Sequence, residues 1–216
     1  MKKHTTKEIL KVILECAKLY QTYLVDKDVL FIYKIKVTNR YEHLEASFKP
    51  HNFFHLTGIE NPNNISALSF YDRCISNTLK EADIQKDRYT DLKLSVLPEL
   101  MQIHRNANML GPSSGSTNCK VYTEKFAGNT RGCLGFKAET DNPNCIIPST
   151  ALREDVRTIT NPTNQIMAIY YKHYESKLYK NISYTAKQLS KTPPTQITWN
   201  KEINAKIDTV NLIDSR

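Results

Sequence analysis

The sequence has 216 residues, and its 30 Lys and Arg against 22 Asp and Glu give a formal net charge of +8. Hydrophobic residues make up 40% of the chain, which is enough for a core and excludes global disorder. Because no run of about 18 apolar residues occurs, we expect no transmembrane helix, no membrane contact and a cytoplasmic location. A positive surface attracts polyanions, so nucleic acid is the first partner to consider.

The N-terminal half is predicted to be mostly helical. Thr5 or Thr6 can cap a first helix, in which apolar residues recur at helical spacing. Pro98 is expected to kink a later helix or to divide it in two. Helices are predicted at residues 5–24, 66–79 and 90–104, with a β-branched and aromatic strand at residues 29–37.

The C-terminal half is predicted to hold strands followed by a polar extension. Strands are expected at residues 120–125 and 133–137, joined by a hairpin-like loop over 126–132, and a last strand at residues 165–174. Helices first and strands later define an α+β class, with N-terminal helices packed on an antiparallel sheet. We expect one domain at residues 1–180, and residues 181–216 as a loosely packed tail or peripheral flap.

The most informative segment for chemistry is residues 48–59, where His51, His55 and Thr57 stand among aromatic residues. We expect residues 44–57 to be extended, which would place alternate side chains on one face. A histidine beside a hydroxyl can act as an acid–base pair near neutral pH. The alternative is a histidine that is bonded to the backbone next to a turn.

RNA cleavage by the 2′-hydroxyl needs a base, an acid and cations that stabilise charge on phosphate. Lys93 is a candidate for that cationic role, although a lone lysine is more often a surface residue. The five cysteines contain no Cys-x-x-Cys pair and no His-Glu-x-x-His motif occurs, so we expect free thiols, no metal site and no cofactor.

Further basic and aromatic residues are candidates for nucleic-acid binding, because tyrosines can stack on bases while cations contact phosphate. The alternative is that alternate tyrosines pack into the core and the basic residues coat the surface. Together with His51, the candidates are Lys125, Arg131, Arg153, Tyr171, Lys172 and His173.

Several motifs together resemble a family of phage-associated nuclease domains in the barnase–EndoU–colicin–RelE-like superfamily. They are Phe48-Lys-Pro-x-x-Phe-x-His-Leu-Thr-Gly-Ile59, Phe70-Tyr71, Leu92-Lys-Leu-x-x-Leu97 and Leu134-Gly-Phe136, within residues 5–179. The resemblance implies N-terminal helices followed by an antiparallel sheet that binds RNA, and chemistry without metal. It also implies that His55 and Thr57 lie in the site, with Lys93 as a phosphate partner.

The function expected from residues and resemblance is a metal-independent endoribonuclease of phage or mobile-element origin. Two alternatives stay open. The domain could bind RNA or an acidic protein without chemistry, as a module acting against a host defence system. It could also be a toxin that an antitoxin or immunity protein controls.

Overall fold

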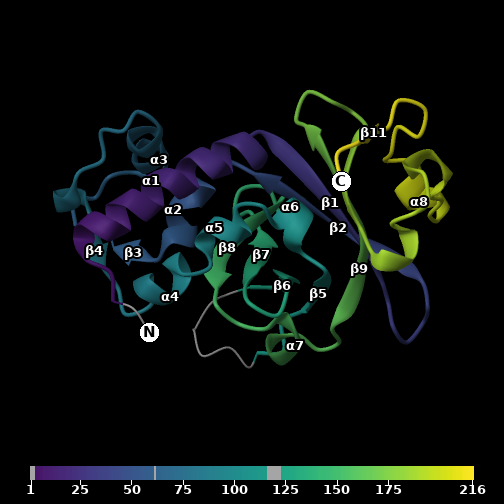
Figure 1. Ribbon diagram of the computed structural model, residues 1–216, viewed down its shortest axis with the longest axis horizontal. Helices are drawn as coiled ribbons and strands as arrows, with labels where there is room; N and C mark the ends of the chain where they lie inside the picture. The colour runs from purple at the N-terminus through teal and green to yellow at the C-terminus, as the bar shows by residue number, and fades with distance from the viewer. Residues whose placement is uncertain (1–2, 61, 116–122) are drawn as a thin grey trace.

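A curled, mainly antiparallel sheet forms the centre of the protein, with N-terminal helices at one side and the C-terminal segment at the other (Figure 1). The computed structural model describes residues 3–60, 62–115 and 123–216. The predicted α+β class and the single body are confirmed. Among the strands in these ranges, the two-residue strand β11 alone runs parallel to its neighbour, β10.

The helices in the described part of the chain are mostly short. The α-helices are α1 (Thr6–Tyr23), α2 (Asn52–Thr57), α3 (Ala67–Ile75), α4 (Thr90–Leu94), α5 (Leu97–Leu100), α6 (Ile103–Asn106), α7 (Val156–Ile159) and α8 (Lys201–Asn204). The 3-10 helices are η1 (Glu81–Asp83), η2 (Lys187–Leu189) and η3 (Pro194–Gln196).

The strands of the main sheet follow the order β11-β10-β9-β5-β6-β7-β8, and β1 pairs with both β2 and β9. Their bounds are β1 (Lys27–Lys34), β2 (Tyr41–Phe48), β5 (Met109–Pro112), β6 (Lys125–Gly128), β7 (Cys133–Ala138), β8 (Ile146–Leu152), β9 (Asn164–His173), β10 (Asn181–Thr185) and β11 (Ile213–Asp214). A separate pair joins β3 (Ile59–Glu60) to β4 (Gln85–Lys86).

The first helix forms as the sequence predicts. Thr5 caps α1 in a capping box, in which its side chain accepts from the Glu8 amide and Glu8 accepts from the Thr5 amide. One face of α1, including Ile9, Ile13 and Tyr20, is buried in the larger core. This core also takes in the helices α2 to α6 and one face of the sheet, so it fixes the N-terminal helices against the strands.

The prediction of an extended segment over residues 44–57 is wrong in its second half. Strand β2 ends at Phe48, and Asn52–Thr57 forms the helix α2, which ends at Gly58 in the left-handed conformation (φ 67°). The aromatic and apolar residues there fit a helical repeat better than an alternating one, because Phe53, Leu56 and Thr57 are all buried.

Other predicted bounds also change. The segment predicted at 90–104 as a helix that Pro98 kinks or divides in two forms three short helices, α4, α5 and α6, and Pro98 stands in the first turn of α5. The first strand of the predicted hairpin begins at Lys125 and extends to Gly128, into the expected loop; residues 120–122 lie outside the described residues. The strand predicted at 165–174 is β9, but it is not the last.

The expected loose packing of residues 181–216 is wrong. Strand β10 pairs with β9, and a second core buries Ile182, Trp199 and Ile203 of this segment against Leu30 and Ile32 of β1. The indole nitrogen of Trp199 donates to the hydroxyl of Tyr170, 3.2 Å away. The C-terminal segment therefore covers the second face of β1 and β9.

Candidate functional site

Helix α2 brings two of the predicted residues, His51 and His55, to one face. His51 is the N-cap of α2 but has helical dihedral angles (φ −67°, ψ −19°), so His55 follows it by one helical turn. Side chains four residues apart on a helix are neighbours, with Cβ atoms about 5–6 Å apart. His55 is exposed and His51 is half-buried, so both imidazoles are accessible to solvent.

Lys93 reaches the same helix from α4. Its Nζ lies 3.4 Å from the carbonyl oxygen of His55, near the end of α2. The lysine stem passes directly over Gly58, where an added Cβ would stand 2.4 Å from Cδ of Lys93. The positive φ at this position favours glycine, and an added Cβ would push the flexible lysine stem aside.

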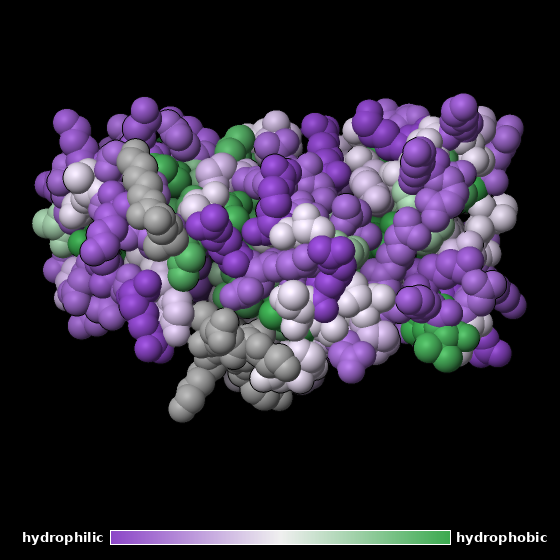
Figure 2. Space-filling view, turned by 60° about the horizontal axis from the view of Figure 1, so that its bottom comes forward, coloured by the Kyte–Doolittle hydropathy of each residue, from purple (hydrophilic) through white to green (hydrophobic). Residues whose placement is uncertain are grey.

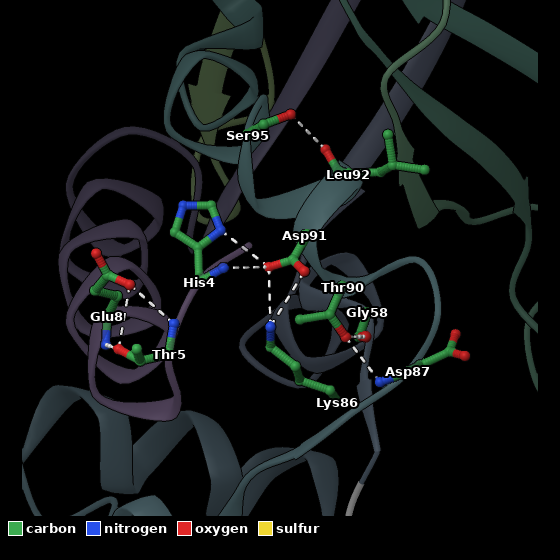
Figure 3. Close-up of polar contacts among 10 residues, drawn as sticks. All are labelled: His4, Thr5, Glu8, Gly58, Lys86, Asp87, Thr90, Asp91, Leu92 and Ser95. Atoms are coloured by element: carbon green, nitrogen blue, oxygen red, sulfur yellow. Dashed lines mark hydrogen bonds and ion pairs between the residues drawn. The ribbon is translucent and has the colours of Figure 1, made fainter. Parts of the chain in front are cut away.

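The position of α4 depends on contacts with the segments around it (Figure 3). The Thr90 hydroxyl donates to the carbonyl oxygen of Gly58, which ties α4 to the end of α2. Asp91 accepts from the backbone and ring of His4, at 3.0 Å each, and from Lys86. Burial alone would raise the pKa of Asp91, but these donors outweigh it and lower the pKa to about 2.

His55 stands in a positive environment. Although it is exposed, neighbouring protein atoms remove part of its water, and this desolvation is the main cause that lowers its pKa below 6.5. The positive charges of Lys137 on β7, of His51 and of Lys93 lower the pKa further. The imidazole of His55 is therefore neutral at pH 7, the state in which it can accept a proton.

His51 faces the carboxylate of Glu139, which directly follows β7. Its Nε2 lies 3.9 Å from an oxygen of Glu139, an ion-pair distance for the protonated ring. Lys49 donates to both oxygens of Glu139, at 2.7 and 2.6 Å. Those hydrogen bonds are the main cause of the lowered pKa of Glu139, which keeps the carboxylate charged beside His51.

Thr57 does not share the face of the histidines. It is fully buried, and its hydroxyl donates to the carbonyl oxygen of Phe54, 2.7 Å away. The prediction that His55 and Thr57 project together depended on an extended backbone, whereas residues two apart on a helix point to different sides. The Thr57 hydroxyl therefore stabilises the end of α2 and does not face solvent.

The two predicted arginines lie beyond α4. Arg153 is exposed and lines a small hollow together with Lys93, so it borders the α2–α4 surface. Arg131 donates to Glu99, 2.7 Å away, in a larger hollow that Arg153 also lines. Glu99 offsets the charge of Arg131, and Glu154 lines both hollows beside Arg153, so Lys93 is the link between Arg153 and the face of α2.

Lys125 is separated from this surface. It lines a pocket between β2 and the hairpin of β7 and β8, together with Asp28, Glu45 and Glu124. Its Nζ lies 5.9 Å from the centre of the Tyr33 ring. Three carboxylates in the same lining make this pocket less suited to a polyanion than the face of α2.

The cluster predicted at the end of β9 divides between the two faces of the strand. Tyr171 is half-buried, and its ring packs 5.8 Å from that of His104. Lys172 points to the opposite side and pairs with Asp28 at 3.1 Å, with little exposed surface. His173 is exposed and lies opposite Lys27, at the end of the sheet from which α2 follows.

Sequence reasoning did not connect two residues of this surface, Lys137 and Glu139, with the histidines. Lys137 lies in the last part of β7 and Glu139 directly follows that strand, far from α2 along the chain, and no local pattern links them to a histidine. One sequence signal for a helix was available. His51 and His55 have helical spacing, and so do the apolar residues Phe53 and Leu56, which favours a helix over a strand.

Comparison with known proteins identifies the class as a nuclease. A family model described as phage-Barnase-EndoU-ColicinE5/D-RelE like nuclease4 matches residues 12–188. The chain therefore belongs to this nuclease family, and the resemblance seen in the sequence is confirmed. No curated protein and no solved structure matches the chain.

Two further features are absent from the described residues. No group of three or more His, Cys, Asp or Glu side chains is arranged to hold a metal ion among residues 3–60, 62–115 and 123–216. In the same part of the chain, no helix combines the length and apolar character needed to cross a membrane.

Proposed function

We propose that the protein is an endoribonuclease that cleaves RNA with the imidazoles of His51 and His55 and without a metal ion. The observation that carries the proposal is the pairing of these two rings on one exposed face of α2, with Lys93 and Lys137 beside them. Two imidazoles and two cations supply the base, the acid and the charge stabilisation that transfer to a 2′-hydroxyl requires.

In the proposed reaction, neutral His55 accepts the proton of the 2′-hydroxyl, and the 2′-oxygen attacks phosphorus. The bond between phosphorus and the 5′-oxygen breaks, and protonated His51 gives its proton to that leaving oxygen. Lys93 and Lys137 stabilise the negative charge on the phosphoryl oxygens. The products are a 2′,3′-cyclic phosphate and a 5′-hydroxyl end, so all atoms and protons are accounted for.

The direct test is RNA cleavage in EDTA by the wild type, His51→Ala and His55→Ala. We expect the wild type to cleave and each variant to lose about 10²- to 10⁴-fold in rate, the usual contribution of a general acid or base. His43→Ala is the matched control, because His43 is a half-buried histidine with a lowered pKa in a different pocket.

The outcomes separate the parts of the proposal. Intact RNA in every tube, or full activity of His55→Ala, would contradict the assignment of the site. Cleavage that stops on chelation and returns with a divalent cation would contradict the metal-independent mechanism.

A further inference from the structure

A second surface, at the opposite end of β1 from α2, has the composition of a binding site. It is a groove of about 1120 Å³ between the turn that joins β1 to β2, the loop before β9 and the 3-10 helix η2. The β1–β2 turn and α7 lie at the lower edge of Figure 1, the edge turned forward in Figure 2, where hydrophilic residues cover most of the face. Ligand sites for single small molecules measure about 300–1,000 Å³, so this groove can hold several linked units.

The charge of the groove is positive. Its lining contains Lys34, Lys36, Arg157 and Lys187, and no carboxylate belongs to the described lining. Asp155 pairs with Arg157 at 2.5 Å and offsets its charge. Within the described residues, no ion pair with a carboxylate is found for Lys36 or Lys187, and both are exposed. These two lysines give the groove an unbalanced positive charge, which attracts a polyanion.

The groove also offers partners for bases. Tyr184 and Met109 are half-buried in its lining and provide aromatic and apolar surface on which a base can stack. The exposed amides of Asn39, Asn108 and Asn161 carry both donors and acceptors, as the edges of unpaired bases require. Cations, a tyrosine and amides together are the combination by which proteins hold single-stranded RNA.

The groove and the histidine face are far enough apart to contact different nucleotides. Strand β1 has eight residues, so Lys34 lies about 23 Å from Lys27 along it, at about 3.3 Å per residue. Lys27 pairs with Phe48, just before α2, whereas Lys34 lines the groove. A single nucleotide cannot reach both places, but a longer strand can.

We propose that this groove is a binding site for single-stranded RNA, which holds a substrate strand at a distance from the bond that is cut. The assignment of the strand as substrate rests on the proposed ribonuclease function. It predicts that the groove increases the affinity for long RNA and has no effect on the cleavage of a dinucleotide.

The test compares two double variants with the same change of charge. Lys36→Gln/Lys187→Gln alters the groove, and Lys7→Gln/Lys18→Gln alters exposed lysines on α1. Both are made in a His55→Ala background, and binding of a labelled 12-nucleotide oligouridylate is followed by fluorescence anisotropy from 50 to 200 mM salt. We expect about five- to tenfold weaker binding by the groove variant alone, and a salt dependence reduced by about 1.4 in slope, since two phosphate contacts are lost.

A second measurement uses the same double variants with His55 intact. We expect the groove variant to raise KM for long RNA about five- to tenfold and to leave kcat for a dinucleotide unchanged. Equal affinities of the groove and control variants for the oligouridylate would overturn the proposal. If the wild type binds RNA through the groove but cleaves none, the ribonuclease function fails while the groove remains an RNA-binding site.

Discussion

The two ends of strand β1 carry different chemistry. At the Lys27 end, α2 presents His51 and His55, with Lys93 and Lys137 near them. At the Lys34 end, the groove presents lysines, amides and a tyrosine, and no histidine is part of its described lining. Imidazoles exchange protons near neutral pH, whereas lysines and amides bind without doing so. The two proposals therefore make the Lys27 end the cleaving end and the Lys34 end the holding end.

The largest expected effect is on the rate constant at the cleaving end. Lys93→Met keeps the stem that passes over Gly58 but removes the charge, so we expect kcat to fall about tenfold to hundredfold. Lys36→Met removes a charge from the other end and should leave kcat unchanged. Steady-state kinetics with the same long RNA compares the two, and an equal loss of kcat in both variants would remove the distinction between the ends.

The next effect is on the free energy of unfolding. It concerns the C-terminal segment, which contributes Tyr184 and Lys187 to the groove. Ile203 is fully buried in the second core, so Ile203→Ala should lower the free energy of unfolding by about 2–4 kcal/mol. Urea denaturation measures this change. An exposed apolar residue, Val210, gives the control, because Val210→Ala should have an effect below about 0.5 kcal/mol. Equal stability of both variants would contradict the packing of the C-terminal segment.

A third prediction contrasts two histidines near the Lys27 end. His104 is buried between Tyr23 and Tyr171, and burial, followed by Arg105 and Lys27, lowers its pKa to about 3. Between pH 6.5 and 3 the unfolded chain takes up a proton here that the folded chain does not. Stability is therefore present above pH 6.5 and falls by at most about 1.4 kcal/mol per pH unit as the pH drops.

The variant His104→Phe tests this contrast because it keeps a ring between the two tyrosines. We expect urea midpoints measured from pH 7 to pH 5 to fall less steeply for His104→Phe than for the wild type. His173→Phe, which changes an exposed histidine, should keep the wild-type slope. Identical slopes for all three proteins would show that His104 does not titrate as its burial implies.

The smallest expected effect is a shift in pH dependence. Lys137 helps to lower the pKa of His55, so Lys137→Met should raise that pKa toward 6.5. The acidic limb of kcat/KM, where His55 becomes protonated and inactive as a base, should then move to higher pH by less than about one unit. Lys18→Met on the outer face of α1 is the control. A limb that stays in place, with an unchanged His55 titration by NMR, would exclude this coupling.

The fold class and the long elements could be predicted from the sequence. The capped, periodic segment gave α1, the β-branched run gave β1, and the Phe70 segment gave α3. The six-residue helix α2 was predicted as a strand end because Phe53, His55 and Thr57 fit an alternating pattern, although the spacing of His51 and His55 also fits a helix. The burial of Thr57 and the exposure of His55 follow from contacts with α3, the next α-helix, and with β8, which is distant in sequence.

The C-terminal segment was misjudged because its apolar residues are sparse and have no period. A signal for it was present in β1, where Val29 to Ile32 are all apolar and therefore need cover on both faces of the strand. The groove could not be predicted, because Lys36, Asn161 and Lys187 come from three separate segments. Only the pairing of β1, β9 and β10 brings them together.

The chemistry of the RNA ends after cleavage tests the central claim most directly. RNA is incubated with the protein in EDTA, and the new ends are identified by mass spectrometry. Cleavage by His51 and His55 through the 2′-hydroxyl predicts 2′,3′-cyclic phosphates and 5′-hydroxyls, and no cleavage of RNA methylated at its 2′-oxygens. New 5′-phosphates, or cuts in the methylated RNA, would contradict the account.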